Sequence, residues 1–227
     1  MRLLPSSASS AALLHRAPLA TVWSAAFLAS PLRRAPLATM SSAAKRVLVP
    51  VADDSEDIET ACITDVLIRA GAEVTVASVM PSLQVRLARG LKLTADCSID
   101  DCASAEWDAI ACPGGMPGAE NLRDSATLTA LLKKQASAGK LTAAVCASPA
   151  VIFATHGILN GPATCYPAPQ FKEKIDGWTD AQAVVDGHIL TSQGPGTSLQ
   201  FALKIVEELY GRPKAEELAA GLLTHLA

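Results

Sequence analysis

Short apolar runs alternate with longer amphipathic segments from about residue 45 to the C-terminus. The runs that predict strands are residues 46–52 (RVLVPVA), 73–79, 90–96, 108–112 and 141–145. Segments with helical spacing lie at residues 55–71, 119–139, 197–211 and 213–223, and Gly71 and Gly139 mark the ends of the first two. Strands that alternate with helices of this length indicate βαβ units and a parallel sheet covered on both faces.

The pattern changes after Gly161. The short runs ATCY, AQAVV and HILTS are separated by glycine-containing turns and predict a small β excursion before the helix at 197–211. No stretch rich in Pro, Gly or Ser divides the chain after residue 45. We therefore predict one domain over residues 45–227.

Residues 1–44 have a different composition. They are rich in Ser and Ala, and residues 1–40 contain four arginines and no acidic residue. This composition is typical of a transit peptide for a mitochondrion or chloroplast. A secretory signal and a disordered leader before an internal start at Met40, which would leave the protein cytosolic, are the alternatives. In each case the segment stays outside the fold.

Charge and hydropathy exclude two classes of partner. The chain after residue 40 has a net charge of −7, against −3 for the whole sequence, and phosphate contacts need clustered Lys and Arg. We therefore expect no nucleic-acid binding. The apolar run LATVWSAAFLA is shorter than the ~20 residues that span a bilayer, so we predict no membrane segment.

The cysteines are too few and too scattered for a disulfide scaffold in a domain of this size. There are six, at Cys62, Cys97, Cys102, Cys112, Cys146 and Cys165, and no Cys-x-x-Cys motif occurs. We expect reduced thiols, of which at most one or two have a special role. No metal site and no cofactor are predicted.

Cys146 is the strongest candidate nucleophile. The segment AAVCASPA places it between the strand at 141–145 and a helix with Pro149 in its first turn. This strand–turn–helix context is that of a nucleophile elbow, and a helix N-terminus can lower the pKa of a cysteine. A buried, inert cysteine is the alternative. Gly114 and Gly115, at the end of a neighbouring strand, let backbone N–H groups approach an oxyanion or simply form a turn.

Glu59 supplies a possible partner for the thiol. Helical spacing places it on the same apolar face as Ile63, Val66 and Ala70. A carboxyl group on a buried face needs a purpose, and burial would raise its pKa enough to keep it protonated near neutrality. A thiol and such a carboxyl group are sufficient for acid–base chemistry on a carbonyl compound.

Several motifs, in order, resemble the DJ-1/PfpI superfamily and its DJ-1 branch, with plant and algal members the most similar in appearance. They are KRVLVPVADDSEDIET, ACPGGMPGAENLRD, AAVCASPAV and ILTSQGPGTSLQFALKIVEELYG. The resemblance covers residues 45–226. It implies a flavodoxin-like, doubly wound, mostly parallel sheet with helices on both faces, and a homodimer.

The same resemblance implies a chemistry. Cys146 matches the family's nucleophilic, oxidation-sensitive cysteine, Glu59 its partner, and Gly115 with Ala147 the backbone donors. The implied activity is a glutathione-independent glyoxalase, a lyase of the D-lactate dehydratase type that converts methylglyoxal and water to lactate. The resemblance also implies a deglycase activity of the same enzyme on early glycation adducts. A redox-sensing or chaperone role through oxidation of Cys146 is the alternative.

Two residues depart from the family pattern in the pocket segments, which also include Gly114 and Pro195. Tyr166 stands where some members have a histidine, and tyrosine, with a pKa near 10, is a poor base near neutrality. Gln193 stands where an arginine is frequent. A glutaminase of the amidotransferase type is disfavoured, because Asp186 and His188 are expected to surround a strand instead of forming an acid–histidine pair. His156 is expected to be structural.

Overall fold

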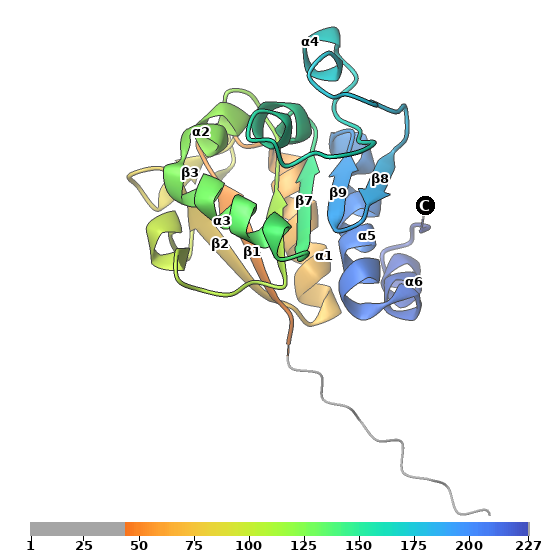
Figure 1. Cartoon of the computed structure of the whole chain (residues 1–227). Coiled ribbons are helices and arrows are strands. Elements are labelled where there is room, and N and C mark those ends of the chain that lie inside the picture. Colours follow the sequence, from red (N-terminus) through yellow and green to blue (C-terminus); the bar gives the residue numbers. More distant parts are fainter. Residues whose placement is uncertain (1–43, 227) are drawn as a thin grey trace, which may run out of the picture. The chain divides into compact units, whose positions relative to one another are not determined.

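The described part of the protein, residues 44–226 of a computed structural model, is built on a seven-stranded sheet (Figure 1). The strands follow the order β5-β2-β1-β6-β7-β9-β8. Their bounds are β1 Arg46–Val51, β2 Glu73–Ser78, β5 Cys97–Ser98, β6 Ala109–Cys112, β7 Leu141–Val145, β8 Ala183–Asp186 and β9 Ile189–Ser192. Neighbours are parallel except β8, which runs antiparallel to β9 at the edge. The flavodoxin-like α/β class is confirmed.

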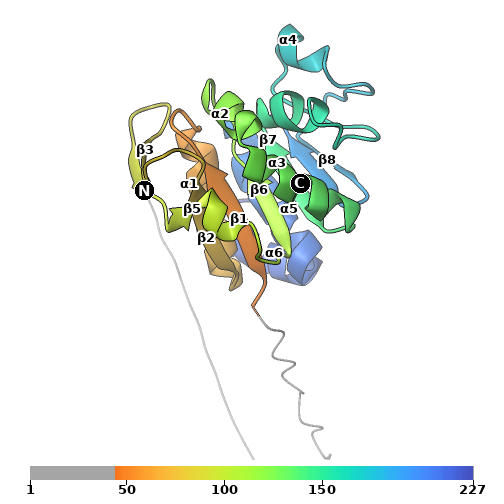
Figure 2. The same ribbon diagram turned by 60° about the vertical axis from the view of Figure 1, so that its left-hand side comes forward.

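Helices cover both faces of this sheet (Figure 2). On one face lie α1 (Asp57–Ala70), α5 (Ser198–Tyr210) and α6 (Arg212–Gly221), and on the other α2 (Gly118–Asp124) and α3 (Ala126–Ser137). The shorter helical segments are η1 (Ile99–Cys102), η2 (Pro149–Ala154), α4 (Pro169–Lys172) and η3 (Pro195–Thr197). A separate hairpin joins β3 (Gln84–Arg86) and β4 (Lys92–Thr94).

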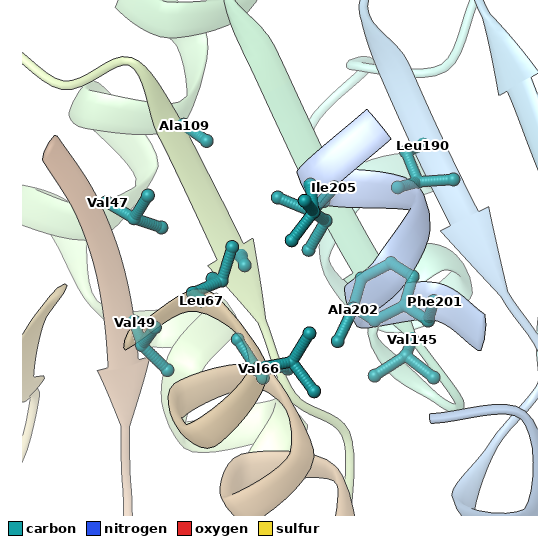
Figure 3. Close-up of a cluster of buried hydrophobic side chains, with 14 of the residues drawn as sticks. Val47, Val49, Val66, Leu67, Ala109, Val145, Leu190, Phe201, Ala202 and Ile205 are labelled. Atoms are coloured by element: carbon teal, nitrogen blue, oxygen red, sulfur yellow. The ribbon is translucent and has the colours of Figure 1, made fainter. Parts of the chain in front are cut away.

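Alternate residues of the central strands enter two apolar clusters, because successive side chains of a strand point to opposite faces. The side chains of Val47 and Val49 of β1 lie on the face covered by α1 and α5. The side chain of Leu48 lies on the other face, in the cluster that α3 covers. Figure 3 shows the first cluster, which includes Phe201 and Ile205 of α5 and Leu67 of α1. This double coverage explains the continuous apolar runs of the central strands.

Three sequence-based expectations about elements need correction. The helix expected at 119–139 is two helices, because the Ser125 side chain accepts the Leu128 N–H and caps α3 just after α2 ends. The run at 90–96 forms only β4, which pairs with β3 outside the main sheet. ATCY is not a strand, although Ala163 forms an isolated bridge with Trp178, and HILTS supplies β9, a full member of the main sheet beside β7.

The predicted leader lies outside the described residues, apart from Ala44. Within them, no helix is long and apolar enough to cross a membrane. The parallel strands β1, β6, β7 and β9 all end at one edge of the sheet, and the loops that follow them form the site described next.

Candidate active site

Cys146 occupies a strained elbow directly after β7. Its backbone φ is +64°, which an L-residue other than glycine rarely adopts. Its N–H donates to the Ser192 carbonyl (3.0 Å), and its own carbonyl accepts the N–H of Tyr166 (2.8 Å). The hydroxyl of Ser148 donates to the carbonyl of Pro113 (2.5 Å). This bond connects the elbow to the loop that carries Gly114 and Gly115. These bonds hold the turn in its strained form, and the Cys146 side chain is left at the surface of a cavity.

Glu59 projects from the first turns of α1 and is fully buried. The Glu56 side chain caps this helix by accepting the Glu59 N–H (2.8 Å). Oε2 of Glu59 accepts the N–H of Gly114 (2.7 Å), whereas Oε1 has no hydrogen-bond partner among the described residues. A buried carboxyl oxygen without a partner is costly when the group is ionised, which favours a proton on this group.

Burial is the main reason that the pKa of Glu59 rises from 4.5 to about 7. The N–H of Gly114 and the thiol of Cys146 oppose this shift, and the charge of Glu56 adds to it. The thiol therefore lies close enough to the carboxyl group to affect its pKa, although no contact to Oε1 meets hydrogen-bond geometry. The carboxyl group titrates near neutral pH and can both donate and accept a proton.

The pKa of Cys146 is raised, mainly by burial and then by the charge of Glu59. Backbone N–H groups of Gly115 and Ala147 lower it, but by less. The sequence-based expectation of a lowered pKa is therefore wrong, because burial outweighs the backbone donors. With Glu59 ionised the sulfur stays protonated, and protonation of Glu59 removes the charge that disfavours the thiolate. The two groups thus compete for protons.

The glycine pair makes room for this arrangement. A Cβ atom at Gly114 would lie 2.6 Å from Cβ of Cys146 and 3.0 Å from Oε2 of Glu59. Gly115 has a φ of +94°, and a Cβ there would lie 2.2 Å from the carbonyl oxygen of Asp54. The loop can pass between the elbow and α1 only without side chains at these positions.

A cavity of ≈ 300 Å³ opens beside the thiol. The predicted site residues Gly115, Cys146, Ala147, Tyr166 and Pro195 line it. The ring of Tyr166 packs edge-on against Phe171, at 6.4 Å between ring centroids.

Two of the predicted pocket residues do not line this cavity. Gly114 does not line the cavity, and its backbone N–H donates a hydrogen bond to Oε2 of Glu59. The side-chain amide of Gln193 donates to the carboxylate of Asp180 (2.8 Å), and Gln193 does not line this cavity.

Sequence reasoning missed the other wall of the cavity, which is formed by Glu56, Ala88, Arg89, Met116 and Phe171. Arg89 is brought there by Asp57, whose carboxylate accepts the N–H groups of Arg89 (2.7 Å) and Leu91 (3.1 Å). Arg89 thus lines the cavity, whereas Gln193 does not. These hydrogen bonds join residues more than thirty positions apart in the sequence, so no local sequence pattern could predict them.

The remaining candidate groups, His156, Asp186 and His188, do not line the cavity beside Cys146. Nε2 of His156 lies 2.9 Å from the carbonyl of Arg123 and 3.2 Å from the hydroxyl of Thr129. Asp186 ends β8 and His188 precedes β9. Within residues 44–226, no group of three or more His, Cys, Asp or Glu side chains is arranged to hold a metal ion.

Comparisons with known proteins identify the family of the chain. The family model described as "DJ-1/PfpI family" matches residues 45–208. Protein DJ-1 homolog B of Arabidopsis thaliana is 46% identical over 179 residues, which are 78% of this chain and 41% of that protein. The chain therefore spans less than half the length of this plant relative.

Two further relatives match over most of their length. The glutathione-independent glyoxalase DJR-1.2 of Caenorhabditis elegans is 37% identical, over 76% of this chain and 91% of that protein. The solved structure of oxidized Toxoplasma gondii DJ-1 has a TM-score of 0.77 and 48% identity, over 80% of this chain and 99% of that one. The chain belongs to the DJ-1/PfpI family.

Proposed function

We propose that the protein converts methylglyoxal and water to lactate without glutathione, with Cys146 as nucleophile and Glu59 as proton carrier. The observation that carries this proposal is the buried carboxyl group of Glu59, which has a pKa of about 7 and lies beside the thiol. The name of the Caenorhabditis elegans relative supports the same reaction type.

The first step joins the sulfur to the aldehyde carbon. Glu59 takes the thiol proton while Sγ of Cys146 bonds to C1 of the substrate, and the carbonyl π electrons move to O1. The N–H groups of Gly115 and Ala147, which already act on the sulfur, stabilise the oxyanion. Protonation of O1 by Glu59 gives a hemithioacetal.

The second step is an internal proton transfer. Glu59 removes the proton from C1, which gives an enediolate, and returns it to C2. The hydroxyl proton on O1 passes to O2, and the C1–O1 double bond forms, which converts the adduct to a lactoyl thioester. Water then attacks the thioester carbon, lactate leaves, and the proton returns to the sulfur. The sum is methylglyoxal plus water giving lactate, with no external oxidant or reductant.

The cavity sets the substrate class. Its apolar surface comes from Met116, Tyr166 and Phe171, and Arg89 adds a cation. At ≈ 300 Å³ it is larger than methylglyoxal requires, so we expect it to admit longer α-oxoaldehydes and early glycation adducts as well. This extra volume supports deglycase activity as a secondary reaction of the same pair.

Lactate formation from methylglyoxal in the absence of glutathione tests the proposal. Cys146→Ser is expected to abolish turnover, whereas Cys62→Ser, which removes a half-buried thiol from α1, should retain it. Undiminished lactate formation by Cys146→Ser would show that another nucleophile acts.

A redox role for the same cysteine is the second candidate. If a peroxide oxidises Cys146 to a sulfinate, protonated Glu59 can donate a hydrogen bond to it, and the solved Toxoplasma gondii relative is titled as oxidized. Mass spectrometry after mild peroxide should then find two added oxygen atoms on Cys146 before they appear on Cys112 or Cys165. Earlier dioxygenation of either of those thiols would reject this role.

We also propose a homodimer. Helix α1 exposes two large apolar side chains, Ile58 (53%) and Ile68 (60%), which supports an interface on this helix. Light scattering should give twice the 23.5 kDa mass of the chain, and the mass of one chain at micromolar concentration would contradict the proposal.

A further inference from the structure

Two thiols outside the candidate active site are in contact. Sγ of Cys97, in the edge strand β5, lies 3.5 Å from Sγ of Cys102, at the end of η1. All six cysteines lie in the described part of the chain, and all six are free thiols there. Among these described cysteines, the sulfur–sulfur contact is the one between Cys97 and Cys102. The strands β2, β1 and β6 separate β5 from β7, which carries Cys146 (Figure 2).

Hydrogen bonds within the turn and from helix α3 stabilise the turn between these two cysteines. The hydroxyl of Ser98 accepts the N–H of Asp100 (3.3 Å), and the carboxylate of Asp101 accepts the N–H of Ser98 (3.1 Å), which together form a capping box. Asp100 also accepts a hydrogen bond from the hydroxyl of Thr127 in α3 (2.6 Å). The backbone therefore keeps the two sulfur atoms together before any reaction.

The two cysteines differ in exposure. Cys102 is 3% exposed and packs with Ile99 and Trp107, whereas Cys97 is half-buried. Burial and the contact with Cys97 raise the pKa of Cys102 to about 12, so this thiol stays protonated. Cys97 is the member of the pair that meets small solutes. A disulfide has a sulfur–sulfur distance of about 2.05 Å, so the pair must close by about 1.5 Å.

We propose that Cys97 and Cys102 form a reversible intramolecular disulfide when the protein meets a peroxide. The sulfur of Cys97 attacks one peroxide oxygen, the O–O bond breaks, and a sulfenic acid and water form. The sulfur of Cys102 then bonds to the sulfenic sulfur, the S–O bond breaks, and the hydroxyl leaves with the Cys102 proton as a second water. One hydrogen peroxide is reduced to two waters, and two thiols lose two electrons and two protons.

This oxidation is distinct from oxidation of Cys146. A sulfinate at Cys146 would remove the proposed nucleophile and is not reversed by thiols, whereas a Cys97–Cys102 disulfide is reduced by any strong dithiol. The disulfide should leave methylglyoxal turnover unchanged, because the sheet separates it from the cavity. The inference is independent of the proposed function, since it is measured by peptide mass.

Peptide mass spectrometry of the full-length protein tests the proposal. The reduced protein is treated with hydrogen peroxide, free thiols are alkylated, and the chain is cleaved before aspartate residues, which separates the two cysteines at Asp100. We expect a Cys97–Cys102 cross-linked peptide pair that dithiothreitol abolishes. Two alkylated thiols at a dose that has oxidised Cys146 would overturn the proposal, as would a cross-link found only between two chains.

Variants assign the order of the steps. Cys97→Ser should lose the cross-link, and Cys102→Ala should leave a sulfenic acid on Cys97 that dimedone traps. Cys62→Ser is the matched control and should cross-link like the unaltered protein. Circular dichroism verifies folding, and if Cys102→Ala fails to fold, trapping on Cys97 at early times in the unaltered protein replaces it. Dimedone on Cys102 instead of Cys97 would overturn the assigned order.

Discussion

The main-chain N–H of Gly114 donates a 2.7 Å hydrogen bond to Oε2 of the fully buried Glu59, while no described group bonds Oε1. One oxygen of the carboxyl group is thus fixed, and the other is available for a proton. This places a proton donor and acceptor beside Cys146 without a histidine.

The free energy of unfolding should reveal the buried proton. The unfolded chain releases it near pH 4.5, whereas folded Glu59 holds it until about pH 7. Between these values the folded state binds more protons, so stability falls as the pH rises, by about 3 kcal/mol in total. Glu59→Gln does not titrate and should lack this fall.

Urea unfolding from pH 4.5 to 8 measures this difference. The unfolding free energy of Glu59→Gln should rise relative to that of the unaltered protein across this range. Asp65→Asn, which neutralises an exposed carboxylate on the same helix, is the control and should show no such rise. Parallel curves for Glu59→Gln and the unaltered protein would show that the pKa of Glu59 is not raised.

Gly114→Ala should damage the site. Its Cβ would lie 2.6 Å from Cβ of Cys146 and 3.0 Å from the carbonyl oxygen of Val145, so the elbow must move. We expect a loss of about 1–3 kcal/mol in stability and about 100-fold in kcat/KM. Gly221→Ala, where nothing lies within 4 Å, should change neither activity nor stability appreciably. Equal kinetics in both variants would mean that the loop is not close-packed.

Tyr166→Phe tests whether the position of the family's histidine takes part in proton transfer. The Tyr166 side chain is 45% exposed, and its ring packs against Phe171. Because the proposed mechanism assigns the proton transfers to Glu59, we expect kcat/KM to stay within about threefold of the unaltered value. A loss of about 100-fold in lactate formation would assign the hydroxyl an essential role.

The leader can be tested separately from the enzyme. Residues 1–44 lie outside the described structure except Ala44, and we propose from their composition that they direct import into a mitochondrion or chloroplast. A fusion of this segment to a fluorescent protein should enter one of these organelles. Replacement of Arg33 and Arg34 by glutamate should leave the fusion in the cytosol, and equal import of both fusions would refute the role of these arginines.

Local periodicity was sufficient to predict much of the fold, the burial of Glu59 and the position of Cys146 directly after a strand. The apolar face of α1 revealed that Glu59 is buried, and the apolar run before Cys146 located the end of β7. Both inferences depend on residues within a few positions of each other. The family resemblance is confirmed by the match over residues 45–208.

Features that depend on distant contacts could not be predicted. Arg89 reaches the cavity because Asp57 binds its backbone, and Gln193 avoids the cavity because Asp180 binds its side chain. The pKa of Cys146 rises because burial exceeds the effect of the backbone donors, a balance that requires the packed structure. The helix break at Ser125 is the exception, because it had a local signal. Serine is a preferred N-cap residue and can therefore begin a new helix.

The kinetics of Glu59→Gln test the central claim most directly. The measurement is the rate of lactate formation from methylglyoxal without glutathione, at neutral pH, for Glu59→Gln, Asp65→Asn and the unaltered protein. Alkylation of Cys146 in each protein verifies that the elbow is intact. We predict that Glu59→Gln loses at least about 100-fold in kcat/KM while Asp65→Asn does not change. Turnover by Glu59→Gln at the rate of the unaltered protein would contradict the assignment of Glu59 as the proton carrier.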